Sequence, residues 1–136
     1  MAIALKPGDA IPSGRVFRRI QPYRSRFGDG RPKIGAFRPP DGDNGELSLI
    51  WEGRASQEAV LAALMINWPD FGLCAVDIET IRAEVGDRVR FIYDPDPEDR
   101  VLGHAHVTVP HCDDAVQTIL LRHAKVIKPP EGPQII

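Results

Sequence analysis

His104 and His106 lie two residues apart in the segment 103–109, which we expect to form a strand. Residues two apart on a strand point to the same face, so both imidazoles would project together. Imidazole titrates near neutral pH and can act as a general acid or base. The spacing therefore makes His104 and His106 the candidate catalytic residues, for proton transfer to or from a substrate.

Two other interpretations of this segment stay open. The paired imidazoles could share a metal ion, with His111, Cys112 and Asp113 as further ligands if the chain turns back at Pro110. This spacing does not fix a third ligand, so no metal site is assigned, and the sequence leaves the cofactor unknown. Alternatively, both histidines simply form the polar face of a strand whose other face packs on the core.

Arginine is concentrated near the N-terminus and could bind an anion there. The planar guanidinium pairs with phosphate through two parallel hydrogen bonds. Tyr23 and Phe27 lie among these arginines, and cations interleaved with aromatic rings suit a nucleotide or a single-stranded nucleic acid. No named nucleic-acid motif is present. The candidate anion-binding residues are Arg18, Arg19, Arg24, Arg26 and Arg31.

The distribution of charge supports two different functions for these arginines. The net charge is −2, but residues 1–38 hold nine basic and two acidic residues, whereas residues 39–136 hold eight basic and seventeen acidic ones. Such asymmetry can mark an anion-binding face. It can equally reflect a basic N-terminal arm that packs across an acidic body, and we favour this second interpretation.

Other residues form weaker patterns that could indicate a functional site. Arg18, Ser48 and Glu52 or Glu84 follow the Arg–Ser–Glu order of ADP-ribosyltransferase-like folds, although residues this common meet such an order by chance. The acidic loop 94–99 contains four carboxylates but lacks the spacing of an EF-hand. Cys112 follows His111, yet adjacent strand residues point to opposite faces. The two cysteines, Cys74 and Cys112, are expected to be reduced thiols.

These residues must be positioned by a mixture of strands and helices. Alternation and β-prone composition predict strands at 15–20, 33–38, 46–51, 73–78, 88–93 and 103–109. Ser56 is a candidate N-cap for a helix to Ile66, and Asp113 or Asp114 for a helix to about Lys125. A brief helix is expected at 79–85, ended by Gly86. This order predicts an α+β fold: a single mixed or antiparallel sheet with two main helices on one face.

Length and composition indicate one domain. The chain has 136 residues, of which 43% are hydrophobic, enough for a core without disulfide or metal staples. Thirteen of the 25 glycines and prolines lie in the first 45 residues. We therefore expect a loop-rich basic arm over 1–45, a compact body over 46–128 and a loose tail over 129–136. The longest apolar run, 59–66, is far below membrane-spanning length, and no signal peptide precedes it, so a cytoplasmic protein is expected.

Several short motifs resemble a widespread group of bacterial proteins. They are the Glu46–Ser48 segment, Phe71-Gly72-Leu73, the 81–85 helix, the Asp94-Pro95-Asp96-Pro97 loop, the His104-Ala105 pair and a terminal helix that ends in Ala124. The group consists of short uncharacterised proteins that share an Asp-Pro-x-Pro loop, a His-Ala strand and an Ala-containing C-terminal helix. This chain differs from the group in that His106 extends the pair to His-x-His. The resemblance implies a bacterial, cytosolic protein and brings no established activity.

Two functions remain open from the sequence. The first is a small accessory protein that binds another protein, indicated by the sparse catalytic signal and the loop-rich N-terminal region. The second is a small enzyme, or a nucleotide or nucleic-acid binder, that acts on a phosphate-bearing substrate. In it, Arg18 and Arg19 would hold the anion and His104 or His106 would transfer a proton. The two functions differ in whether the arginines and histidines line a single cleft.

Overall fold

The computed structural model describes residues 5–40 and 45–131. Within them lie three α-helices, eight strands and three short 3₁₀ segments. The helices are α1 (Gln57–Asn67), α2 (Ile78–Val85) and α3 (Asp114–His123). The strands are β1 (Arg15–Ile20), β2 (Phe27–Gly28), β3 (Arg31–Pro32), β4 (Leu47–Trp51), β5 (Gly72–Asp77), β6 (Ile92–Tyr93), β7 (His106–Val109) and β8 (Lys125–Lys128). The 3₁₀ segments are η1 (Ile34–Phe37), η2 (Gly86–Arg88) and η3 (Gly103–Ala105).

Six strands form one antiparallel sheet, in the order β6-β7-β4-β1-β5-β8, while β2 and β3 make a separate hairpin. With its three α-helices this sheet confirms the predicted α+β fold. The basic N-terminal region is more than a peripheral arm, because β1 is an inner strand paired with both β4 and β5. Residues 132–136 of the predicted tail, and 41–44 of the loop before β4, lie outside the described residues.

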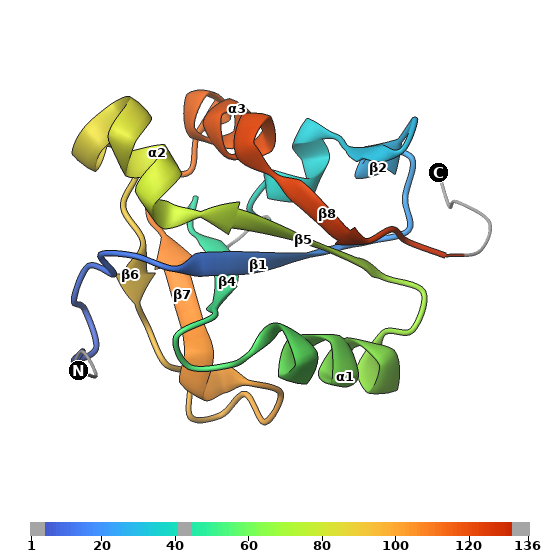
Figure 1. Cartoon of the computed structure of the whole chain (residues 1–136), viewed down its shortest axis with the longest axis horizontal. Coiled ribbons are helices and arrows are strands. Elements are labelled where there is room, and N and C mark those ends of the chain that lie inside the picture. Colours follow the sequence, from blue (N-terminus) through green and yellow to red (C-terminus); the bar gives the residue numbers. More distant parts are fainter. Residues whose placement is uncertain (1–4, 41–44, 132–136) are drawn as a thin grey trace.

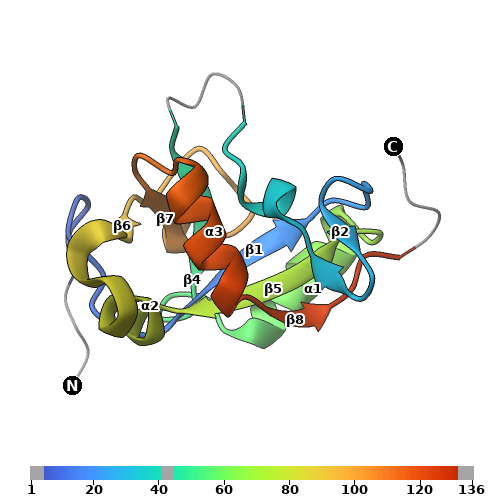
Figure 2. The ribbon, with the colours of Figure 1, turned by 90° about the horizontal axis from the view of Figure 1, so that it is seen from above.

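The helices cover both faces of the sheet, so the prediction of one helical face is wrong. Figure 1 shows α1 on one side of the strands and α2 and α3 on the other, and Figure 2 shows α3 crossing the sheet obliquely. Alternation in β1 explains this arrangement. Val16 and Ile20 join the core with α2 and α3, whereas Phe17 points to the opposite face and packs with Val60 and Leu64 of α1.

Local signals set the helix starts as predicted. The side chain of Ser56 accepts a hydrogen bond from the Ala59 amide, and that of Asp113 accepts one from the Val116 amide. These bonds satisfy amides that have no partner inside the helix. Gly86 ends α2 with a positive φ of 60°, a conformation that glycine adopts without steric cost.

Three predicted strands differ from the structure because tertiary contacts override local alternation. The 33–38 segment folds as η1, where a Cβ on Gly35 would lie 2.2 Å from the Ser25 carbonyl oxygen. In the 88–93 segment only Ile92–Tyr93 is a strand, and Phe91 bonds instead through its carbonyl to the Ile11 amide. The 103–109 strand begins only at His106. Strand β8, by contrast, was not predicted and forms a sheet edge against β5.

Candidate functional site

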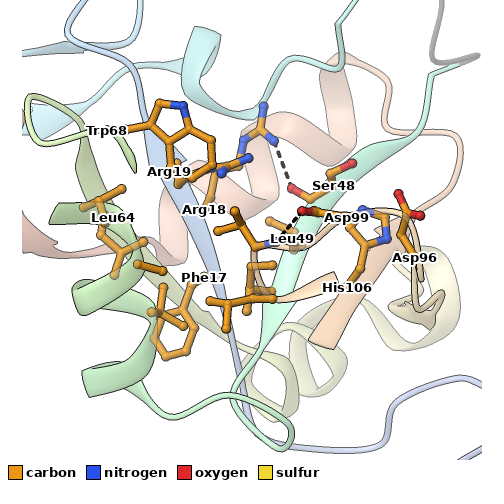
Figure 3. A pocket seen from close by; sticks show the side chains of 16 residues that line it. Phe17, Arg18, Arg19, Ser48, Leu49, Leu64, Trp68, Asp96, Asp99 and His106 are labelled. Atoms are coloured by element: carbon orange, nitrogen blue, oxygen red, sulfur yellow. Dashed lines mark hydrogen bonds between the residues drawn. The ribbon is translucent and has the colours of Figure 1, made fainter. Parts of the chain in front are cut away.

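A cavity of about 210 Å³ opens where β1 and β4 separate. The two strands pair only at Val16↔Trp51 and Phe17↔Ile50. Beyond this point β1 continues along β5 as far as Ile20, while β4 continues along β7. Figure 3 shows side chains from both strands around the cavity, together with α1 and the 94–105 loop. The cavity is thus a consequence of the sheet topology.

Arg18 lies at the point of separation. Its Nη1 donates to the carbonyl oxygen of Ser48 on β4, and its Nε donates to that of Ala36 on η1, both at 2.9 Å. Two of the five guanidinium N–H groups are therefore used, and the other three have no partner among the described residues. Burial lowers the pKa of Arg18 to about 10, so the group stays charged at neutral pH. None of the ion pairs among residues 5–40 and 45–131 includes Arg18.

Arg19, the next residue of β1, lines the same cavity from the α1 side. Its guanidinium carbon lies 3.9 Å from the centroid of the Trp68 ring, a cation–π contact. Displacement of water by surrounding atoms lowers the pKa of Arg19, an effect partly opposed by the negative charge of Asp99. Trp68 itself follows α1 and is tilted against Phe71, which holds its ring beside the cavity. Arg19 is therefore a positioned cation at the cavity rim.

His106 brings an imidazole to the same cavity. Its Nδ1 lies 2.7 Å from the carbonyl oxygen of Asp94, which can only accept a hydrogen bond. Nδ1 therefore carries the proton, and in the neutral ring Nε2 is left with a lone pair. Nε2 has no hydrogen-bond partner in the described part of the chain. This arrangement fixes the tautomer that a proton acceptor needs.

The loop that precedes His106 adds two carboxylates, Asp96 and Asp99, to the cavity lining. One oxygen of each is engaged within the loop, since Asp96 Oδ1 accepts from the Glu98 amide and Asp99 Oδ1 from the Val101 amide. The other oxygen of each has no hydrogen-bond partner among residues 5–40 and 45–131. The remaining wall is apolar, with Phe17, Leu64, Leu73 and Leu102 among its members. The cavity thus combines an apolar wall with cations, carboxylates and a proton acceptor.

The structure brings Arg18, Arg19 and His106 together and places the other predicted site residues elsewhere. His104 belongs to η3, where its Nε2 lies 3.0 Å from the Arg54 carbonyl oxygen. The predicted common face of His104 and His106 is therefore wrong. The cause is the backbone before them: Leu102 has a positive φ of 63°, and this turn delays the strand until His106.

The remaining arginines lie around the β2–β3 hairpin, outside the cavity lining. Arg26 is used internally, donating from Nε to Gln21 Oε1 at 3.1 Å and from Nη1 to the Gly35 carbonyl oxygen. Arg24 and Arg31 are exposed. The five predicted anion-binding residues therefore do not form one cluster.

The weaker sequence patterns do not assemble into sites. Glu52 pairs with Arg15, and Glu84 pairs with Arg122 and His123, so neither glutamate pairs with Arg18. Across residues 5–40 and 45–131, no group of three or more His, Cys, Asp or Glu side chains is placed to hold a metal ion. Cys74 and Cys112 are both buried free thiols.

Sequence reasoning missed Trp68 and the cavity-facing role of Asp96 and Asp99. One feature of the sequence could have identified Trp68: it is a large aromatic residue between the end of a predicted helix and Pro69. The acidic loop stands out in the sequence, but its composition predicts a solvated turn and its spacing does not fit a known cation site. Nothing local indicates that it faces two arginines of a strand some 80 positions earlier in the chain.

No known protein family, curated protein or solved structure shows a significant match to this chain. The resemblance to short bacterial proteins therefore stays a prediction. Among the described residues, none of the helices has the length and apolar character needed to cross a membrane.

Proposed function

We propose that the cavity between β1 and β4 binds a small anionic molecule. The observation that carries this proposal is the guanidinium of Arg18. It is half-buried, charged and without an acidic partner in the described chain, and it keeps three N–H donors beside an open cavity. Partial burial weakens the hydration of this charge and the two carbonyl oxygens do not neutralise it, so an anion that reaches the guanidinium is bound favourably.

The neighbouring groups support the same function. Arg19 adds a second cation, and His106 adds a nitrogen that can accept a proton from the bound molecule. If His106 transfers a proton to or from the bound molecule, the protein is an enzyme in which the arginines hold the anionic substrate and His106 is the acid or base. His104 has no part in this proposal because its ring is bonded to Arg54 outside the cavity.

A thermal-shift series tests the proposal. Acetate, benzoate, inorganic phosphate and AMP are added separately to the wild type and to Arg19→Gln. A ligand at 100 times its Kd stabilises the folded state by about 2.7 kcal/mol, which raises the Tm by roughly 8–12 °C for a domain of this size. We expect at least one anion to raise the Tm, and Arg19→Gln to reduce that rise.

Arg24→Gln is the matched control, because Arg24 is also exposed but lies outside the cavity. It should leave the rise unchanged. If none of the anions shifts the Tm of the wild type, or if Arg24→Gln acts like Arg19→Gln, the cavity is not an anion site.

A second candidate function is binding to another protein through α1. The helix is apolar on nearly every side, and its outward face leaves Met65 and Ile66 exposed, with Ile66 81% accessible. A surface helix is normally polar on its outer face. Glu58 is the only charged residue of α1, so this face offers no charge pattern for recognising a charged partner. A second copy of the chain presents the same uncharged face, and we propose it as the partner.

The solution mass tests this second function. Sedimentation equilibrium should show a dimer for the wild type and a monomer for Ile66→Lys. Glu58→Lys changes charge on the same helix and serves as the control that should remain dimeric. A monomeric wild type at the highest accessible concentration would overturn the idea.

A further inference from the structure

The size of the cavity limits what it can hold. A dry apolar cavity of about 150 Å³ accepts benzene, and pockets for drug-sized ligands are about 300–1,000 Å³. At about 210 Å³ this cavity has room for one six-membered ring with small substituents. A nucleotide, with a base, a sugar and a phosphate, needs considerably more space.

The charges that line the cavity favour a single negative charge on the ligand. Arg18 and Arg19 contribute two positive charges, and Asp96 and Asp99 contribute two negative ones. Asp99 acts on Arg19, whereas Arg18 has no acidic partner in the described chain. A carboxylate carries the one charge that Arg18 can neutralise. A phosphate monoester carries nearly two charges at neutral pH, and the second would be repelled by the two carboxylates.

The unused N–H groups of Arg18 also match a carboxylate in shape. Nε and one N–H of Nη1 are bonded to Ala36 and Ser48. The N–H groups that remain are one on Nη1 and two on Nη2. A guanidinium with donors left on both terminal nitrogens can bind both oxygens of a planar carboxylate.

His106 provides a second polar contact. Its Nδ1 is held by the Asp94 carbonyl oxygen, so the neutral ring presents Nε2 as an acceptor. A ligand that donates a hydrogen bond to Nε2 must carry an O–H or N–H group. A phenolic hydroxyl is a strong donor of this kind, and it can also give up its proton to imidazole.

We infer that the cavity is built for a monocyclic aromatic carboxylate that carries a ring hydroxyl, the class of the hydroxybenzoates. The carboxylate lies on Arg18, the ring packs against Phe17 and Leu64, and the hydroxyl donates to His106 Nε2. This inference rests on the proposed function, since it names the anion that the cavity binds.

Isothermal titration calorimetry on the full chain tests the ligand class. The ligands are 3-hydroxybenzoate, 4-hydroxybenzoate, benzoate, acetate, inorganic phosphate and AMP. One of the hydroxybenzoates should bind at least 10-fold more tightly than acetate, phosphate or AMP, and benzoate should lie between. If phosphate, acetate or AMP binds as tightly as either hydroxybenzoate, the ligand class is wrong but anion binding stands. If nothing binds, both proposals fail.

Two sets of variants locate the binding. His106→Asn keeps a side-chain amide that can donate to the Asp94 carbonyl oxygen but removes the acceptor at Nε2. It should weaken hydroxybenzoate binding by about 3- to 10-fold, the value of one neutral hydrogen bond, and leave benzoate unchanged. Equal weakening of both ligands would overturn the contact with His106.

Substitutions at Ala63 and Ala62, neighbouring residues of α1, test whether the ligand binds in the cavity or on the surface. Ala63 lines the cavity, whereas Ala62 is exposed. Ala63→Phe should fill the cavity and abolish binding of the aromatic ligands, while Ala62→Phe should retain it. Binding that survives in a folded Ala63→Phe, shown by its circular dichroism, would place the ligand elsewhere. If Ala63→Phe does not fold, the ligand series and His106→Asn still decide the inference.

Discussion

Arg18 Nη1 donates a hydrogen bond to the Ser48 carbonyl oxygen at 2.9 Å, immediately beyond the last residue pair that joins β1 to β4. If the pairing of β1 with β4 continued, a main-chain amide of β1 would donate the hydrogen bond to the Ser48 carbonyl oxygen. The guanidinium takes over that role and binds the Ala36 carbonyl oxygen as well. One side chain therefore stabilises the separation of two strands and supplies the positive charge of the cavity that the separation creates.

Arg18→Met should destabilise the fold. Methionine keeps the unbranched apolar stem of arginine but leaves the carbonyl oxygens of Ser48 and Ala36 without their donor. Hydrogen bonds from charged donors and the cost of unpaired carbonyls predict a loss of about 2–3 kcal/mol in the free energy of unfolding. Urea titration at pH 7 measures this loss. Arg24→Met should change it by less than about 0.5 kcal/mol, as an exposed control. A variant as stable as the wild type would show that these carbonyls find other partners.

Glu84 should make the fold sensitive to acid. The pKa of Glu84 lies below its usual range, first because its carboxylate is hydrogen-bonded to His123 and also because it pairs with Arg122. A carboxyl whose pKa is lower in the folded state adds stability above its unfolded-state pKa, and this stability is lost as the pH falls through the folded-state value. Wild-type stability should therefore fall as the pH drops below about 4.3, the ordinary pKa of glutamate.

Urea titrations between pH 3 and pH 7 measure this contribution. Glu84→Gln should be less stable than the wild type at pH 7, and the difference should shrink toward pH 3. Glu84→Gln should still lose some stability as the pH falls, because a hydrogen bond from Arg15 also lowers the pKa of Glu52. Glu79→Gln, an exposed change on the same helix, should follow the wild type. A difference between wild type and Glu84→Gln that is constant with pH would contradict the linkage.

The two thiols should be inert in the folded protein. Burial raises the pKa of both Cys74 and Cys112 to about 12. At pH 8 the thiolate fraction is then on the order of 10³ times smaller than for a free cysteine, and access is blocked as well. With Ellman's reagent at pH 8, we expect no reaction within minutes in buffer and reaction of two thiols per chain in 6 M guanidinium chloride. Rapid reaction of either thiol in buffer would show that its surroundings open readily.

The sequence predicted the elements that local chemistry determines. The position of β1 follows from the β-prone residues Val16, Phe17 and Ile20, and the start of α1 from the Ser56 cap; both signals act within a few residues. The start of β7 could not be predicted, because it follows a left-handed turn at Leu102, a conformation that leucine rarely adopts. Strand β8 was missed since its residues continue from α3 without a turn signal, and only the edge of β5 makes them extended.

The candidate site was predictable only in part, for a related reason. Arg18 and Arg19 stood out by charge, but so did Arg24, Arg26 and Arg31. What distinguishes the first pair is the separation of β1 from β4, a property of the sheet and not of the residues around them. Trp68 and the acidic loop come to Arg19 from distant parts of the chain, so no local pattern could join them.

Gly103→Ala should disturb the loop that carries the acidic side of the cavity. A Cβ at this position would lie 2.1 Å from the Asp96 carbonyl oxygen and 3.0 Å from Asp99 Cβ. The main chain cannot simply move away, because the Asp96 amide donates to the Gly103 carbonyl oxygen at 2.9 Å. Overpacking of this kind costs about 1–3 kcal/mol. The loop should give way before the sheet does, since most of its residues are exposed.

Two measurements separate a local change from a global one. The free energy of unfolding from urea titration should fall by about 1–3 kcal/mol. Hydrogen exchange at the Asp96 amide should accelerate at least 10-fold in native buffer, whereas exchange at amides in the β1–β5 ladder should change only as the lower global stability requires. Arg100→Ala, an exposed change in the same loop, should alter neither quantity. If Gly103→Ala leaves Asp96 exchange at the wild-type rate, the loop tolerates the side chain, and the close contact does not set the position of Asp96 and Asp99.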